Sequence, residues 1–370
     1  MSRRDLDDII PTRAIHVGEI LRDELKAMGM SQKELSALMG IQANILNEII
    51  KGKRSLNADY ATLIEKAIGL PAKTLMRIQA DYEIDCVRIS EKNVKRLKCI
   101  EIWKILKENL NMSFLRKAAG FAGDVIRDVE NIFKIFDVHT IDEFLEKKAK
   151  ELDRAYYKKS EKLTSDANDI FTWKHYCYFL SKEQHKSLPE FDKEQVGDLV
   201  NELKIIFWEN QETNARLKET FEKYGIQFLV VEKLGKVPVD GLSFWAGDNP
   251  TIVVTERMKR IDNLAFSTMH ELGHVVLHLN KDTAPILSIA EDNSDQIENE
   301  ANQFAMDSFV SPKEWDAFYK FVESQKSAYL YQKIKEEAEK LQVHPQILYG
   351  RYMHQKSSYK LPRFFETTIN

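Results

Sequence analysis

The stretch FSTMHELGHVVLH, residues 266–278, places His270, Glu271 and His274 inside a run that is otherwise mostly apolar. We predict a helix here, spanning residues 261–279. Because residues four apart lie on the same face of a helix, both imidazoles can reach one ion. A catalytic zinc site keeps one ligand position for water, and Glu271 follows the first histidine directly, so its carboxylate can take the proton of that water. The alternative is a core helix with two hydrogen-bonded histidines.

A third metal ligand is predicted in the segment DQIENEANQFAMDSFV, residues 295–310. Glu298 can complete a His-His-Glu site, with Asn302 one helical turn later as a hydrogen-bonding partner of the ligands. Glu300 is the rival ligand, but it points about 200° around the helix from Glu298, so at most one of the two faces the ion. Zinc is inferred from the type of ligand, since other divalent ions also accept histidine and carboxylate.

A third histidine, His278, follows the pair on the same predicted helix. It lies about 12 Å along the helix from His270, which is too far for all three imidazoles to converge on one ion. We therefore expect His278 to form a hydrogen bond or to pack, and not to bind the metal.

The composition is that of a globular protein, with 43% hydrophobic and 30% charged residues. No apolar run approaches the roughly 20 residues of a membrane helix, and the start, MSRRDLDDIIPTRA, lacks the apolar core of a secretory signal. The three cysteines share no C-x-x-C spacing, which fits reduced thiols. We expect a cytoplasmic protein with no membrane partner. The net charge of −4 excludes a uniform polycation but leaves room for a local DNA-binding face.

A chain of 370 residues is too long for a single hydrophobic core. Changes in composition and residue pattern along the sequence predict three parts: residues 1–82, 83–205 and 206–370. The first has short helical patterns separated by Gly and Pro. The second is helical throughout, carries no chemical motif and is interpreted as a helical connector. The third has β-rich runs, among them GLSFWAG and TIVVTER, followed by helices, so the fold class is α+β.

Residues 31–52, SQKELSALMGIQANILNEIIKG, have the spacing of a helix-turn-helix. Ser31 and Glu34 form a predicted capping box at the start of the first helix, and Gly40 takes the turn. The residues predicted to pack inward are Leu35, Leu38 and Met39 on the first helix, and Ile41, Ile45 and Ile49 on the second.

The outward side chains of this motif are predicted to contact operator DNA. Short polar side chains at the start of the second helix suit base edges in the major groove, and lysines and arginines neutralise phosphates. The predicted base-reading residues are Gln42, Ala43, Asn44 and Asn47, while Gln32 bonds a phosphate or a neighbouring base and Lys51, Lys53 and Arg54 bind phosphates.

Residues 240–278, DGLSFWAGDNPTIVVTERMKRIDNLAFSTMHELGHVVLH, and 298–312, ENEANQFAMDSFVSP, resemble the ImmA/IrrE family of zinc metallopeptidases. The resemblance covers roughly residues 200–312 and departs in FVSP, where members usually have a Leu-Leu-Met-Pro-like end. It implies a gluzincin-like domain with a small antiparallel sheet, and a substrate strand along an edge strand, with TIVVT or LSFWA as the candidates. It also implies Zn²⁺ on His270, His274 and Glu298, with Glu271 as the general base.

The resemblance continues weakly into LQVHPQILYGRYMHQ, residues 341–355. In that segment Arg351, Tyr352 and His354 are candidates for stabilising the oxyanion of a tetrahedral intermediate. The alternative is that they are surface charges or contacts of the helical tail.

Residues 16–85, beginning HVGEILRDELKAMG, are similar to the HigA-type antitoxins of the Xre/Cro-CI repressor class. The family often has Ser or Thr where this chain has Gln42, Ala43 and Asn44, so the operator sequence does not follow. The second helix itself carries few positive residues, and we therefore expect a homodimer on a two-fold operator.

Two functions follow from these motifs. The first is a DNA-binding regulator with a zinc-dependent peptidase site that cleaves a regulatory protein, either a repressor-like protein or the chain itself. The second is a non-catalytic antitoxin that neutralises a cognate toxin and represses its own operon, with the metal fold as a sensor or partner-binding domain. The intact Glu271 favours the first, because sensing needs no general base.

Overall fold

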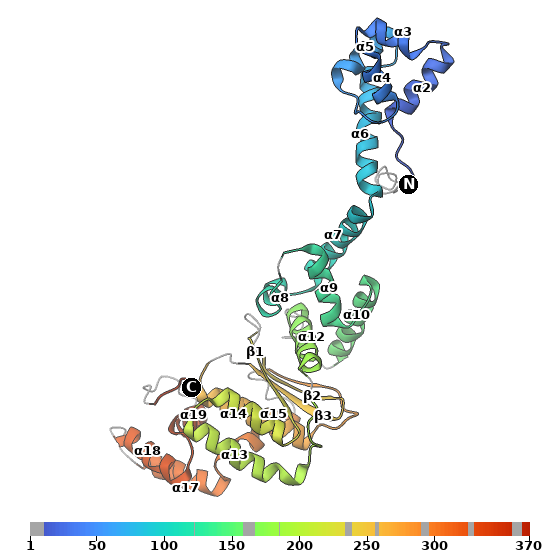
Figure 1. The fold of residues 1–370 in the computed structure, drawn as a ribbon. Coiled ribbons are helices and arrows are strands. Elements are labelled where there is room, and N and C mark those ends of the chain that lie inside the picture. The colour runs from blue at the N-terminus through green and yellow to red at the C-terminus, as the bar shows by residue number, and fades with distance from the viewer. Residues whose placement is uncertain are drawn as a thin grey trace. The chain divides into compact units, whose positions relative to one another are not determined.

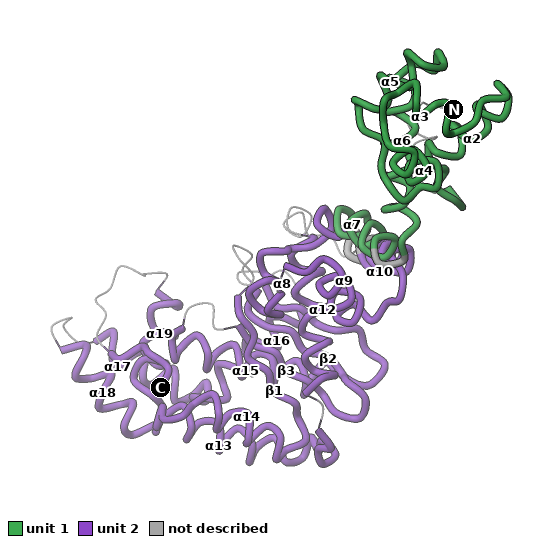
Figure 2. The backbone as a smooth tube through the Cα atoms, turned by 45° about the horizontal axis from the view of Figure 1, so that its top comes forward, with its two compact units in different colours: residues 1–105 green, residues 106–370 purple. Residues whose placement is uncertain are grey.

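The computed structural model describes residues 11–121, 123–157, 167–184, 186–233, 239–255, 259–289, 296–324, 329–356 and 365–370 (Figure 1). The chain divides into two compact units, Met1–Ile105 and Leu106–Asn370 (Figure 2). The predicted boundaries after residues 82 and 205 stay a prediction. Within the described ranges, no helix combines the length and the apolar character that crossing a bilayer requires.

Unit 1 is all-helical, as predicted. Its helices are α2 (Val17–Ala27), α3 (Gln32–Met39), α4 (Ala43–Ile50), α5 (Ala58–Ile68), α6 (Ala72–Ile89) and the first part of α7 (Glu91–Asn109). The predicted capping box is confirmed at the start of α3: Ser31 Oγ accepts from the Glu34 amide at 3.2 Å, and Glu34 Oε2 accepts from the Ser31 amide at 2.7 Å. Gly40 ends α3 with a φ of 66°, so the chain turns sharply into α4.

The inward face of the helix-turn-helix differs from the predicted one. Leu38 is 64% exposed, and Leu35, Ser36 and Met39 form the buried side of α3. At 100° per residue, Ser36 lies on one side of the Leu35–Met39 pair and Leu38 on the other, and the core covers only the first side. On α4 the buried residues are Leu46, Ile49 and Ile50. The predicted Ile41, just before α4, and Ile45 are half-buried and pack against the same core.

Unit 2 is α+β, which confirms the predicted class. Its helices before the sheet are α8 (Met112–Ala118), α9 (Val125–Phe136), α10 (Ile141–Tyr157), α12 (Ala167–Glu183), α13 (Val196–Glu209) and α14 (Thr213–Lys223). Those after the third strand are α15 (Ile261–Leu277), α16 (Gln296–Phe309), α17 (Pro312–Glu323), α18 (Leu330–Leu341) and α19 (Pro345–Gln355). The helices predicted over 261–279 and 295–309 are therefore present as α15 and α16.

The described sheet has strands β1 (Gln227–Val231), β2 (Val239–Ala246), β3 (Asn249–Thr255) and β4 (Ile286–Ile289) in the order β1-β3-β2-β4. It is mixed and not purely antiparallel, because β1 runs parallel to β3. A tight turn at Gly247, with a φ of 62°, makes β2 and β3 a hairpin, and β1 and β4 pair on its two outer sides. The predicted edges, LSFWA and TIVVT, are thus interior strands, and β1 and β4 are the edges.

Helices cover both faces of this sheet (Figure 1). On one face, Phe228 and Ile252 share a core with Leu272 of α15 and with residues of α13 and α14. On the other face, Ser181 of α12 donates to Gln227 Oε1 of β1 at 2.5 Å. The sheet therefore supports α15, the helix that contains His270, Glu271 and His274.

Candidate metal centre

Helices α15 and α16 pack closely at the point where the candidate ligands meet. Gly273 lies between the two histidines of α15, and a Cβ added there would lie 3.2 Å from the Cα of Ala301 on α16. Small residues at this crossing let the backbones approach. The approach brings Glu298, in the first turn of α16, beside His270 and His274.

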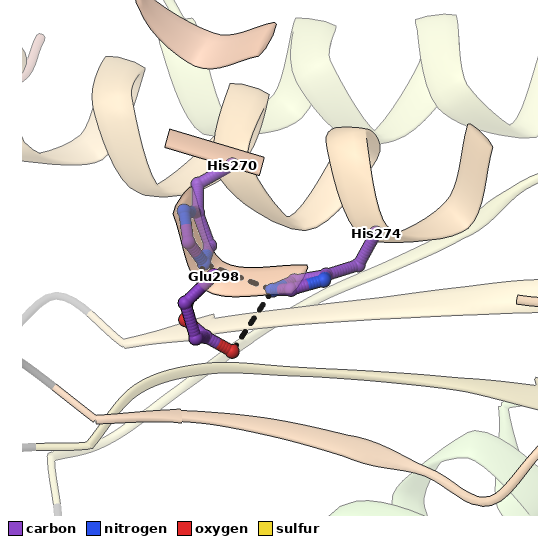
Figure 3. Close-up of side chains that lie close together, drawn as sticks. All are labelled: His270, His274 and Glu298. Carbon is purple, nitrogen blue, oxygen red and sulfur yellow. Dashed lines mark hydrogen bonds and ion pairs between the residues drawn. The ribbon is translucent and has the colours of Figure 1, made fainter. Parts of the chain in front are cut away.

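The three side chains converge on one point (Figure 3). The two Nε2 atoms of His270 and His274 lie 3.0 Å apart, and Glu298 reaches them with Oε2 at 3.2 Å and Oε1 at 3.3 Å, respectively. Burial would raise the pKa of Glu298, but its hydrogen bonds with the two histidines hold that pKa at about 2. The carboxylate is therefore ionised and placed against two imidazole nitrogens.

This donor set fits a divalent cation. Two imidazole nitrogens and one carboxylate are a common protein ligand set of catalytic zinc sites, and Zn²⁺ would leave a fourth position open. The His274 side chain is 0% exposed and that of Glu298 is 12% exposed, so the ligand atoms are already removed from bulk solvent. Little further desolvation is needed to bind an ion.

Polar partners on the far side of each imidazole orient the ligands. His270 Nδ1 lies 2.9 Å from Asn302 Oδ1, the partner predicted for that position. His274 Nδ1 lies 3.0 Å from His278 Nδ1. His278 in turn contacts Glu300 Oε2 through Nε2 at 3.0 Å, so neither His278 nor the rival Glu300 is part of the ligand cluster.

The Glu271 carboxylate is fully buried between α15 and the sheet. Ser243 of β2 donates to Glu271 Oε2 at 2.6 Å. Gly241 leaves the space for the other oxygen, since a Cβ there would lie 2.2 Å from Glu271 Oε1. Burial raises the pKa of Glu271, against the opposing effect of His270. Glu271 Oε1 meets no described donor within hydrogen-bond distance, although the hydroxyl of Ser288 is near enough to lower the pKa of this carboxyl.

The sequence analysis did not predict that Glu271 packs against Gly241 and Ser243. Gly241 and Ser243 alternate along β2 and therefore face the same side, and Ser288 of the edge strand β4 pairs in register with Gly241. The small residues Gly241 and Ser243, at alternate positions of β2, were the one sequence feature that could have indicated space for a buried side chain. The position of Glu271 beside these residues could not be predicted from the motif alone, because the packing of α15 against β2 is a long-range contact.

The candidates for oxyanion stabilisation lie elsewhere, and that prediction is corrected. Arg351 Nη1 donates to the carbonyls of Met306 and Val310, at 2.8 and 3.2 Å, and its guanidinium stacks on Trp315 at 4.1 Å. It therefore closes the C-terminal end of α16, whereas Glu298 is in the first turn. Burial lowers the pKa of Arg351 to about 10.

The other two candidates are also engaged or exposed. The hydroxyl of Tyr352 donates to Glu323 at 2.7 Å, and His354 is exposed near the end of α19. Both belong to the packing and the surface of the helical tail, which was the alternative.

Most of the predicted DNA-contacting residues lie on α4 or just before and after it, whereas Gln32 begins α3. Gln42, Ala43 and Asn44 are exposed, and Asn47 and Gln32 are half-buried. The phosphate-binding candidates Lys51 and Lys53 are exposed after the helix.

One basic candidate has a partner already. Arg54 Nε lies 2.8 Å from Glu48 Oε2 on α4. This pair neutralises the only acidic side chain of α4, which would otherwise repel a phosphate backbone.

Comparisons with known proteins find matches to two parts of the chain. Residues 221–320 match the model of peptidase family M78, described as the IrrE N-terminal-like domain, and residues 21–75 match a helix-turn-helix model. The chain is 36% identical to virulence-associated protein I of Dichelobacter nodosus over 72 residues, which are 19% of this chain and 67% of that protein. The two model matches confirm the predicted fusion of a helix-turn-helix to an IrrE-type domain.

Solved structures with similarity to the chain include two antitoxins. An addiction module antidote protein of the HigA family from Coxiella burnetii is 32% identical, with a TM-score of 0.22, and the match covers 24% of this chain and 94% of that one. Antitoxin GraA is 26% identical, with a TM-score of 0.21, over 21% of this chain and 85% of that one.

Proposed function

Since the chain belongs to the family of virulence-associated protein I through its helix-turn-helix domain and carries an IrrE N-terminal-like domain, we propose that it is a DNA-binding regulator with a metal-dependent peptidase site. The observation that carries the proposal is the buried cluster of His270, His274 and Glu298 next to the buried carboxylate of Glu271.

The residues around the cluster divide the work of peptide hydrolysis. A divalent ion held by the three ligands, Zn²⁺ in our proposal, would polarise the scissile carbonyl and make a nearby water more acidic. Glu271 Oε1 takes one proton as the water oxygen bonds to the carbonyl carbon. As the C–N bond breaks, Glu271 returns this proton to the leaving amine. Ser243, through its bond to Glu271 Oε2, keeps the carboxylate in place during both transfers.

The substrate proposed is an extended segment of a regulatory protein. Strand β4 is an edge of the sheet, and its residue Ser288 lies opposite Gly241, beside which Glu271 is seated. A peptide added to this edge would bind through its main chain, with little demand on its sequence. Repressor-like proteins and the chain itself are the candidates, because the helix-turn-helix would bring the site to the regulators bound at the same DNA.

The test of the peptidase proposal uses the full-length protein loaded with Zn²⁺. It is incubated with purified helix-turn-helix regulators and alone, and new N-termini are found by mass spectrometry. We expect Glu271→Gln to lower cleavage by at least 100-fold while the metal content is kept, and the exposed Glu339→Gln to change nothing. Cleavage that continues unchanged in the Glu271→Gln protein would contradict the proposed role.

For DNA, we propose that the exposed residues Gln42, Ala43 and Asn44, with Asn47, read base edges and that Lys51 and Lys53 bind phosphates. A homodimer on a two-fold operator is part of this proposal. Gel shifts on duplexes selected from a random library, combined with sedimentation, give its test. Tight binding by a strictly monomeric protein would overturn the dimer.

A second candidate function is a regulator whose metal domain senses a ligand or binds a toxin without catalysis. The complete burial of Glu271 and His274 favours it, because no substrate reaches these atoms in this conformation. Such a protein keeps DNA binding and toxin neutralisation after Glu271→Gln. Loss of the regulatory response in that variant argues for the peptidase instead.

A further inference from the structure

We infer that His278 and Glu300 are positioning residues for the metal ligand His274. The inference rests on the proposed metal site and assigns a joint role to two side chains outside the ligand cluster. His278 is the C-cap residue of α15, one helical turn after His274, and Glu300 lies on α16. Together they connect the ends of the two helices that supply the ligands.

The contacts form a continuous chain from a carboxylate to the metal-facing atom. Glu300 Oε2 lies 3.0 Å from His278 Nε2, and His278 Nδ1 lies 3.0 Å from His274 Nδ1. Gln296 donates to the other Glu300 oxygen at 2.6 Å, which fixes the carboxylate. The His278 side chain is 9% exposed, so water does not compete freely for its ring nitrogens.

With a metal ion in place of the contact between His274 and Glu298, counting protons outward from Glu300 gives one tautomer for each ring. A carboxylate only accepts, so His278 must carry its proton on Nε2 and donate it to Glu300. The Nδ1 atom of a neutral His278 is then an acceptor, and His274 must donate from its own Nδ1. The lone pair of His274 is then on Nε2, the atom 3.3 Å from Glu298 Oε1, and a metal ion bound there would replace the contact with this carboxylate.

The second ligand uses a shorter version of the same arrangement. His270 Nδ1 faces Asn302 Oδ1 at 2.9 Å, an acceptor that favours a proton on Nδ1 and so makes Nε2 the atom that would bind an ion. Both rings are thus oriented by partners that involve α16, one directly and one through His278. Partners of this kind change metal affinity by about 10–100-fold when removed.

The experiment measures metal affinity and tautomer separately in the full-length protein. Affinity for Zn²⁺ is obtained by competition with a chelating dye. The tautomer of His274 is read in metal-free protein carrying Glu298→Ala, in which no carboxylate competes for a proton on Nε2. Long-range ¹⁵N–¹H spectra give the tautomer, and the His274 signal is assigned among the nine histidines by single substitutions. We expect His278→Phe, which removes the acceptor, to weaken Zn²⁺ binding by 10–100-fold and to populate the Nε2–H tautomer of His274.

Two further variants separate positioning from packing. His278→Asn keeps an oxygen near the place of Nδ1 and is expected to recover most of the affinity and the Nδ1–H tautomer. Glu300→Ala is expected to weaken binding by less than His278→Phe, because His278 retains its acceptor. The matched control is Asp307→Asn on the same helix, which removes a charge that contacts Gln303 and is expected to leave both readouts unchanged.

The outcomes distinguish this inference from the proposed function. If the unchanged protein binds no Zn²⁺, the metal site fails, while the tautomer spectra still decide whether His278 orients His274. If the protein binds Zn²⁺ and His278→Phe leaves affinity and tautomer as they were, the inference is overturned. Equal losses in His278→Phe and His278→Asn also overturn it, since they show that only the shape of the ring matters.

Discussion

At residue 241 the absence of a side chain makes room for the buried carboxylate of Glu271. A Cβ on Gly241 would lie 2.2 Å from Glu271 Oε1 and 2.5 Å from its Cδ. Neither the strand nor α15 can give way easily, because both are enclosed in the core of unit 2. The space for Glu271, the proposed general base, therefore depends on Gly241, which lies thirty positions earlier in the chain.

The first prediction concerns this glycine. We expect Gly241→Ala to lower the free energy of unfolding by about 1–3 kcal/mol through overpacking, and to displace Glu271 so that cleavage falls with it. Gly197→Ala is the matched control, since Gly197 is in α13 and a Cβ there meets nothing within 4 Å. The control is expected to stabilise the protein by about 0.5–1 kcal/mol. Urea unfolding of both variants checks the opposite signs.

A buried ionic group in the helices before the sheet makes unit 2 sensitive to acid. Glu151 contacts Lys174 and lies 2.7 Å from His175 Nε2. Burial would raise the pKa of Glu151, but His175 and Lys174 hold it at about 2, against 4.5 for an unperturbed carboxyl. Burial lowers the pKa of His175, so the folded state keeps its ring neutral.

The second prediction is the pH dependence that follows. A depressed carboxyl pKa gives stability that is complete above about pH 4.5 and is lost as the pH falls toward 2, on the order of 3 kcal/mol for Glu151. The lowered pKa of His175 acts in the same direction below pH 6.5, where the unfolded chain takes up the proton. Urea midpoints from pH 7.5 to 3.5 should fall more steeply in the unchanged protein than in Glu151→Gln. Parallel curves would refute this origin.

At the scale of the elements, the C-terminal segment 365–370 accepts hydrogen bonds from the first residues of two helices. The amide of Ile261, the first residue of α15, donates to the Thr367 carbonyl at 2.8 Å. The amide of Thr213, the first residue of α14, donates to Asn370 at 2.7 Å. Asn210 clasps the segment by donating to the Thr368 carbonyl at 2.8 Å. The side chain of Arg260, the N-cap of α15, accepts no hydrogen bond from the first turn. The C-terminal segment therefore provides an acceptor for the free amide of Ile261.

The third prediction is that this clasp stabilises the helix of the metal ligands. Asn210→Gly keeps a residue that tolerates the φ of 46° at this position but removes the side chain. We expect a loss of about 1–2 kcal/mol in unit 2 and faster hydrogen exchange at the Ile261 amide. The amides of α4 in unit 1 serve as the internal control. Unchanged exchange at Ile261 would show that the segment does not hold α15.

Elements defined by local signals could be predicted from the sequence, and those defined by distant pairing could not. The capping box at Ser31, the turn at Gly40 and the ligand spacing of His270 and His274 depend on residues within one or two helical turns. The parallel pairing of β1 with β3, the exposure of Leu38 and the role of Arg351 depend on which surface packs against them. Glu298 was within reach because its helix shows a clear periodicity.

At the scale of the whole molecule, two units with separate cores predict separate unfolding. An ion bound in unit 2 stabilises only that unit, by about 2.7 kcal/mol at a hundred times the dissociation constant. The fourth prediction is therefore that chelation by EDTA lowers one calorimetric transition by about 5–10 °C and leaves the other unchanged. A shift of both transitions, or of neither, would contradict this division.

The fifth prediction concerns DNA binding by unit 1. Each lysine that binds a phosphate contributes about one unit to the slope of log affinity against log salt. Lys51→Ala and Lys53→Ala are each expected to reduce the slope by about one on any duplex. Lys340→Ala, on α18 of unit 2, is the control and should leave the slope unchanged. An equal change for Lys340 would place the DNA interface elsewhere.

The proposed peptidase site requires that one divalent ion is held by side chains of α15 and α16. Its most direct measurement is the metal content of protein reconstituted with Zn²⁺ and freed of excess ion, for the unchanged chain and for His270→Ala, His274→Ala and Glu298→Ala. We expect one ion per chain, and loss of that ion in each of the three variants. A chain without bound ion, or a stoichiometry that survives the loss of Glu298, would contradict it.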